Sequence, residues 1–129
     1  MGSRQIPVAL WAGVVAMMPA TTHAQGITRQ PLQTNDFPAG YTTVTAIATI
    51  APGACAGLHI HPGLEMAYIL EGELILKVAG KPDQKFKAGD SLQNPDAVKH
   101  DACNPGNVPT KTLGIYVAEK GKPLASPAQ

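Results

Sequence analysis

Residues 53–72 of this chain read GACAGLHIHPGLEMAYILEG, and this stretch decides how the whole sequence is interpreted. His59 and His61 are two positions apart, so on a β-strand their imidazoles leave from the same face. A Pro-Gly turn follows, and it can bring the carboxylate of Glu65 back beside the two imidazoles. The stretch therefore predicts two histidines and one carboxylate gathered at one place.

Short β-rich runs separated by turn residues continue on both sides of this stretch. Turns are signalled by glycine, proline, asparagine and aspartate, and the chain holds 13 glycines and 12 prolines. The strands are expected at residues 41–50, 54–61, 65–71, 73–79, 84–87, 91–94, 98–104 and 110–118. Eight short strands with this punctuation are typical of an antiparallel sandwich or barrel, so the sequence predicts one all-β domain.

A third histidine, His100, lies in the strand expected after Pro95. Once that strand pairs with the first, three imidazoles and one carboxylate come together. Such a ligand set suits iron, manganese, nickel, copper, cobalt or zinc and argues against calcium, which binds oxygen alone. A solitary histidine is more often hydrogen-bonded than metal-bound, but these four side chains together predict one divalent transition metal ion per chain. The expected metal ligands are His59, His61, Glu65 and His100.

The spacing of these residues resembles the two sequence motifs of the cupins. The first, G(X)5HXH(X)3-4E(X)6G, is matched by Gly53, His59, His61, Glu65 and Gly72. The second, G(X)5PXG(X)2H(X)3N, is matched by Gly89, Pro95, His100 and Asn104, with Ala97 in place of the second glycine. The resemblance implies a small single-domain cupin, an all-β antiparallel jelly-roll barrel whose four motif side chains bind the metal. Alanine at position 97 strains the turn if φ is positive there.

Residues 1–24 are expected to be a secretory signal peptide. Residues 6–18 are largely apolar, and small residues stand at the −3 and −1 positions of a cleavage site after Ala24. Cleavage there predicts an exported protein, periplasmic or secreted, that keeps no membrane segment. The alternative is a buried N-terminal helix, which Pro7 and Gly13 disfavour.

The rest of the chain divides into three expected parts. Residues 25–40 are polar and contain Pro31 and Pro38, so they are expected to form an extended arm. Residues 41–120 form the expected barrel. Residues 121–129 are expected to be a loose C-terminal tail.

The two cysteines leave two possibilities open. Export permits a disulfide, and the antiparallel pairing implied by the resemblance brings Cys55 and Cys103 to a similar height. The parity of the positions argues against a bond, because Cys55 shares the face of His59 whereas Cys103 is an odd number of residues from His100. Two separate thiols are therefore the favoured interpretation, and a β-bulge would be needed to pair them.

The resemblance leaves three classes of function open. Small cupins resemble dioxygenases of the quercetinase type, so the leading hypothesis is a metal-dependent oxidoreductase acting on a small organic substrate that chelates the metal. The alternatives are a non-oxidative lyase or isomerase and a non-catalytic module that binds a small ligand. With three histidines committed to metal, proton transfer would fall to Glu65, a tyrosine, a lysine or metal-bound water, and Glu65 is the candidate catalytic residue. Four further side chains could line a substrate pocket, but core filling is the favoured interpretation and none of them is taken as catalytic: Met66, Tyr68, Phe86 and Tyr116.

Charge and family resemblance also bear on the partners. The chain has 10 Lys and Arg against 9 Asp and Glu and no basic stripe, so nucleic acid is not an expected partner. A small-molecule ligand or substrate is expected instead. The resemblance implies a homodimer.

Overall fold

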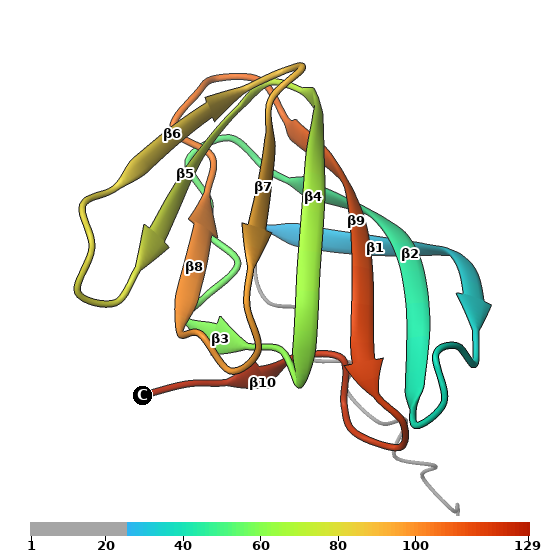
Figure 1. Ribbon diagram of the computed structural model, residues 1–129. Coiled ribbons are helices and arrows are strands. Elements are labelled where there is room, and N and C mark those ends of the chain that lie inside the picture. The colour runs from blue at the N-terminus through green and yellow to red at the C-terminus, as the bar shows by residue number, and fades with distance from the viewer. Residues whose placement is uncertain (1–25) are drawn as a thin grey trace, which may run out of the picture.

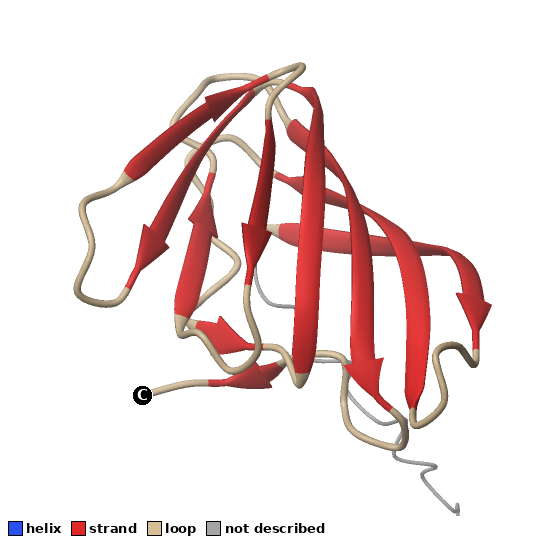
Figure 2. Cartoon of the chain, in the orientation of Figure 1, coloured by secondary structure: helices blue, strands red, loops and turns tan. Residues whose placement is uncertain are grey.

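The structure, a computed structural model, describes residues 26–129. The expected signal peptide lies outside the described residues. The described part consists of strands and loops (Figure 2). It contains no helix that is long and apolar enough to cross a membrane.

Among residues 26–129, ten strands form two antiparallel sheets of five strands each (Figure 1). The first sheet has the spatial order β1 (Ile27–Asn35), β2 (Tyr41–Ile50), β9 (Thr110–Glu119), β4 (Gly63–Glu71) and β7 (Ser91–Asn94). The second has the order β10 (Ser126–Pro127), β3 (His59–Ile60), β8 (His100–Cys103), β5 (Glu73–Val78) and β6 (Gln84–Lys87). The predicted all-β jelly-roll fold is confirmed.

The eight expected strands are joined by two more, at the ends of the described chain. The segment expected to be an arm contains β1, which pairs with β2 along its length. The sequence did not predict this strand, because Ile27 is its only buried residue and the rest of the segment is mostly polar. The expectation of a loose C-terminal tail was wrong, because β10 pairs with β3 and Ala128 N–H donates to Leu58 O at 3.0 Å.

Strand β3 is shorter than its expected range of 54–61. The backbone is interrupted at Gly57, where φ is +88°, and regular pairing begins only at His59. His61 therefore follows the strand rather than lying on it. The two-residue spacing placed both imidazoles correctly on the inner side, although the regular strand is only two residues long.

Aliphatic side chains from both sheets make the core. Strand β9 alternates buried and half-buried residues along its whole length, as a strand with one face on a core does. Ile69 on β4 is fully buried. Leu74 and Leu76, which face inward from β5, are each 3% exposed. The core cluster consists of Ile27, Ala48, Ile50, Ile69, Leu74 and Leu76. Burying these side chains stabilises the contact between the sheets.

The turn before β8 contains the residue that departs from the cupin motif. Ala97 has a φ of +56°, so this alanine adopts the left-handed backbone conformation that was expected to strain the turn. A left-handed conformation costs an L-residue other than glycine about 1 kcal/mol. The turn keeps this geometry because Ala97 N–H donates to His61 O at 3.1 Å, which ties it to the segment after β3.

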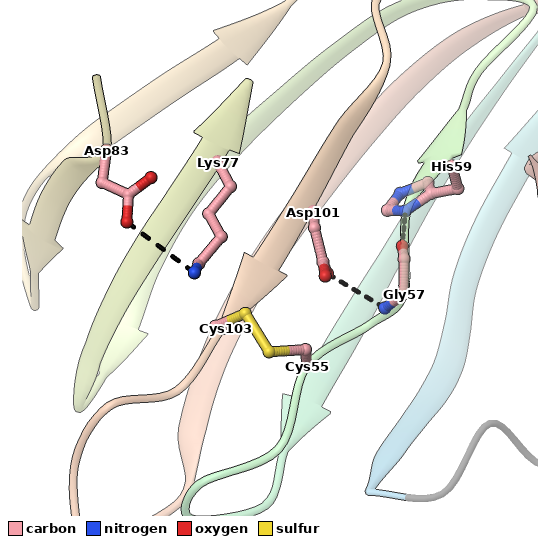
Figure 3. The surroundings of a disulfide bond; sticks show 7 residues. All are labelled: Cys55, Gly57, His59, Lys77, Asp83, Asp101 and Cys103. Carbon is pink, nitrogen blue, oxygen red and sulfur yellow. Dashed lines mark hydrogen bonds and ion pairs between the residues drawn. A yellow bond between two sulfur atoms is a disulfide. The ribbon is translucent and has the colours of Figure 1, made fainter. Parts of the chain in front are cut away.

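A disulfide joins Cys55 to Cys103, so the favoured interpretation of two separate thiols was wrong (Figure 3). The two residues face each other in an isolated antiparallel bridge, with their Cα atoms 4.0 Å apart. His59 pairs with His100, so the register shifts by one residue between the two pairs. The parity argument assumed an unbroken strand, and the irregular backbone at Gly57 removes that assumption.

We expect the disulfide to contribute to stability because it closes a loop of 48 residues in sequence separation. Replacing both cysteines with serine should lower the free energy of unfolding by about 2–4 kcal/mol. Urea unfolding of the two proteins measures this difference. Reductant should destabilise the parent protein and leave the double variant unchanged. Equal stability of parent and variant would contradict the prediction.

Candidate metal centre

Three histidines from the second sheet and the segment after it form one cluster. His59 on β3 pairs directly with His100 on β8, and His61 follows β3 by one residue. One ring nitrogen of each lies within 4.8 Å of the others. Their exposed fractions are 9%, 2% and 4%, so the imidazoles gather inside the barrel rather than on its surface.

Each imidazole is oriented by a backbone carbonyl at its Nδ1 atom. His59 Nδ1 lies 2.6 Å from Gly57 O, His61 Nδ1 lies 2.6 Å from Leu124 O, and His100 Nδ1 lies 2.9 Å from Val98 O. A carbonyl only accepts, so each Nδ1 carries the proton and donates. In the neutral rings this leaves the lone pair on Nε2. Hydrogen bonds of this kind orient histidine ligands in metalloproteins.

The carboxylate of Glu65 lies close to the Nε2 atoms of His61 and His100. Its Oε2 is 3.1 Å from His100 Nε2 and 3.3 Å from His61 Nε2. Asn94 Nδ2 donates to this oxygen at 2.8 Å. The structure thus brings together all four side chains that the sequence nominated as metal ligands.

The charges within this cluster are strongly coupled. Burial acts to raise the pKa of Glu65, but the neighbouring His100 and His61 outweigh burial and hold its pKa well below the usual range. Burial acts to lower the pKa of His100, but the Glu65 carboxylate raises it overall. The pKa of His59 is lowered, mainly because its ring is buried. Glu65 is therefore an anion at neutral pH.

One ring nitrogen makes the fit to a metal ion specific. His61 Nε2 is buried and has no hydrogen-bond partner among residues 26–129. A buried polar nitrogen without a partner is costly, and a bound cation would satisfy it. Three imidazole nitrogens and one carboxylate oxygen are also a donor set that divalent transition metals accept. The residues present therefore fit the predicted ion.

A narrow cavity extends from this cluster into the barrel, with about 450 Å³ of empty space when its open mouth is included. His59, Glu65 and His100 form its polar end. Its walls are mainly aliphatic and come from both sheets, with Ile27, Ile50, Leu74, Leu76 and Leu92 among them. Small-molecule sites typically combine such apolar walls with a few convergent polar groups.

Two further residues contact this site: Asn94, which the sequence did not assign to it, and Tyr116, for which core filling was the favoured interpretation. Asn94 and Tyr116 lie directly opposite Glu65 on the neighbouring strands β7 and β9. Tyr116 lines the cavity, and its ring centroid is 5.0 Å from that of His61. Burial and the charge of Glu65 raise the pKa of Tyr116, so its hydroxyl keeps its proton. Asn94 immediately precedes Pro95 of the second motif, and this position is the sequence feature that could have pointed to its role.

Three other side chains interpreted as core filling lie elsewhere. Phe86 is half-buried and packs against the core cluster, as expected. Met66 and Tyr68 instead face the outer side of the first sheet, where they line a separate hollow. For these two residues the core interpretation was wrong, because the even-numbered positions of β4 point away from the barrel.

Residues 46–116 match the sequence model of a family described as Cupin domain. The chain belongs to the cupin family. No curated protein matches its sequence. Solved structures with the same fold include the DMSP lyase DddQ from Ruegeria pomeroyi, which is 18% identical with a TM-score of 0.67. This cupin aligns over 80% of its own length and spans about half, 52%, of DddQ.

Two further structures show how widely this fold occurs. A cupin-like protein from Thermotoga maritima is 23% identical, with a TM-score of 0.66 and coverage of 79% of this cupin and 75% of that chain. Oxalate decarboxylase from Bacillus subtilis is 26% identical, with a TM-score of 0.63 and coverage of 75% and 27%. These similarities establish the cupin fold and leave the reaction to be argued from the site itself.

Asn94 should be a positioning residue whose loss destabilises the cluster. Asn94→Ala removes a buried hydrogen bond to a charged carboxylate, so the metal-free protein should lose about 1.5–3 kcal/mol of unfolding free energy. Gln93→Ala, at the adjacent outward-facing and exposed position, should change it by less than about 0.5 kcal/mol. Urea unfolding of both variants makes the comparison. Equal losses would show that the bond to Glu65 does not matter.

Proposed function

We propose that this cupin is a metal-dependent, dioxygenase-like oxidoreductase that acts on a small organic substrate able to chelate the metal. His59, His61, His100 and Glu65 would hold one divalent transition metal ion. The observation that carries the proposal is the cluster of three imidazoles, each oriented by a carbonyl at Nδ1, with the Nε2 atoms of His61 and His100 beside one carboxylate.

An ion bound by these side chains would supply Lewis acidity or redox chemistry to a chelating substrate. The protein contributes the orientation of the reacting groups and their protection from water. Asn94 holds Oε2 of Glu65 in place, and this carboxylate is the group able to accept a proton from the substrate. The aliphatic walls of the cavity keep the substrate in a setting of low polarity, where electrostatic interactions are stronger.

A non-oxidative lyase or isomerase is the second candidate, and Tyr116 is the observation that favours it. Such reactions need one group to remove a proton and another to return it. Tyr116 keeps its hydroxyl proton and lies opposite Glu65, so the site holds a possible acid beside a possible base. Among proteins with this fold, DddQ is named as a lyase and the B. subtilis protein as a decarboxylase. Oxygen uptake during turnover separates the two candidates.

The ligand variants test the proposal directly. His59→Ala, His61→Ala and His100→Ala should each lose most of the bound metal, because each removes an oriented nitrogen that nothing nearby replaces. Glu65→Gln should keep much of the metal and lose most of the oxygen uptake, because the base and the charge disappear together. Elemental analysis and an oxygen electrode, with flavonols, diketones and phenols as substrates, measure both quantities. Glu65→Gln protein that kept full activity would remove Glu65 from the reaction.

We also propose that the protein is exported after cleavage of residues 1–24. The apolar run and the small-residue site ending at Ala24 support this. A disulfide between Cys55 and Cys103 is in keeping with an oxidising compartment. N-terminal sequencing of the exported protein should begin at Gln25. A mature mass that still includes Trp11 would contradict the proposal.

The homodimer is supported by an apolar outer face on the first sheet. Met66, Tyr68, Leu113 and Ile115 line a hollow there, and Tyr68 is 46% exposed. Exposed patches of this kind mark association sites. Light scattering should give twice the monomer mass for the parent protein and the monomer mass for Ile115→Lys. Lys85→Glu on the other sheet is the control and should remain a dimer, whereas a monomeric parent would overturn the proposal.

A further inference from the structure

Arg29 on β1 is an exposed cation that lines the cavity ending at the histidine cluster. Along β1 it is two residues from Ile27, which is buried and also lines the cavity, so the two side chains leave from the same face. Its partner across the strand pair is Ala48, a buried residue that lines the same cavity.

Nothing in the described part of the chain neutralises this guanidinium. The ion pairs found between residues 26 and 129 do not include Arg29. It is the one Lys or Arg among the residues that line the cavity. An unpaired arginine at the edge of an aliphatic cavity is a site for an anion.

We propose that Arg29 binds the carboxylate of a small organic acid whose other end, carrying a second oxygen donor, lies at the histidine cluster. This inference rests on the proposed function, since it names the class of chelating substrate. The planar guanidinium fork matches a carboxylate with two parallel hydrogen bonds. A phosphate monoester carries between one and a half and two negative charges at neutral pH, more than one arginine balances, so a carboxylate is the better match.

The aliphatic walls of the cavity indicate the chemistry of the rest of the ligand. Besides Arg29 and the polar groups of the metal centre, the cavity is lined by aliphatic side chains such as Ile50, Leu74 and Leu92. A short hydrocarbon body fits such walls, whereas a sugar would leave hydroxyl groups without partners. The ligand is therefore an anion at one end, apolar in the middle and an oxygen donor at the other. The short keto acid 4-oxopentanoate, whose carboxylate and keto oxygen are separated by two methylene groups, is a suitable probe.

Arg29 gives its own spectroscopic signal in the protein that begins at Gln25, because it is the only arginine after Arg4. In a ¹H–¹⁵N spectrum of this protein without metal, the Nε–H resonance of Arg29 should shift as 4-oxopentanoate is added. The neutral methyl ester of the same acid should leave the resonance in place. An unchanged resonance with the acid at saturating concentration would overturn the inference.

Calorimetry on the metal-loaded protein supplies the affinities. Arg29→Gln should weaken binding of 4-oxopentanoate about tenfold or more and leave binding of its methyl ester within twofold. Arg29→Lys keeps the charge and loses the fork, so its loss of affinity should be smaller. Lys87→Gln removes one exposed charge from β6 and should leave the affinity unchanged. Equal affinity of parent and Arg29→Gln, or tighter binding of ethyl phosphate than of 4-oxopentanoate, would overturn the inference.

The outcome of the resonance experiment does not depend on whether the proposed oxidoreductase activity is correct. The resonance shift is measured without metal and without turnover, so it stands even if the metal-loaded protein consumes no oxygen. Conversely, oxygen uptake on neutral diketones with no response at Arg29 would keep the oxidoreductase and overturn the anion site.

Discussion

Three hydrogen bonds from imidazole Nδ1 atoms to backbone carbonyls determine what this site can do. They join His59 to Gly57, His61 to Leu124 and His100 to Val98, so each ring is held by a different segment of the chain. Because the proton sits on Nδ1, the three Nε2 lone pairs remain available to an ion. The buried carboxylate of Glu65 completes the cluster, and its negative charge makes a cation the natural occupant.

The antiparallel register of the first sheet places the other polar groups of the site. Glu65 stands opposite Asn94 on one side and Tyr116 on the other, so three neighbouring strands place a carboxylate, an amide and a phenol in one row. Pairing of β3 with β8 sets His59 beside His100, and the disulfide fastens these same two segments further along. The fold thereby supports the cluster with backbone interactions, and the aliphatic core fills the rest of the barrel.

The motif residues could be predicted because their spacing along the chain reflects strand and turn geometry. That spacing located the eight central strands, His59, His61, Glu65 and His100. Groups opposite one another across strands have no fixed spacing, so Asn94, Tyr116 and Arg29 appeared only with the register. The disulfide was missed because a one-residue register shift leaves no mark in the sequence. The C-terminal strand was missed because its two residues gain their order from β3.

The protonation and metal bonding of the three imidazoles can be read directly by NMR. Zinc is diamagnetic, so long-range ¹H–¹⁵N spectra of zinc-loaded protein report which ring nitrogen carries the proton and which binds the ion. We expect Nδ1–H and metal-bound Nε2 for His59, His61 and His100 alike. A metal bond at Nδ1 of any of the three, or a ring whose resonances do not respond to zinc, would contradict the proposed metal centre.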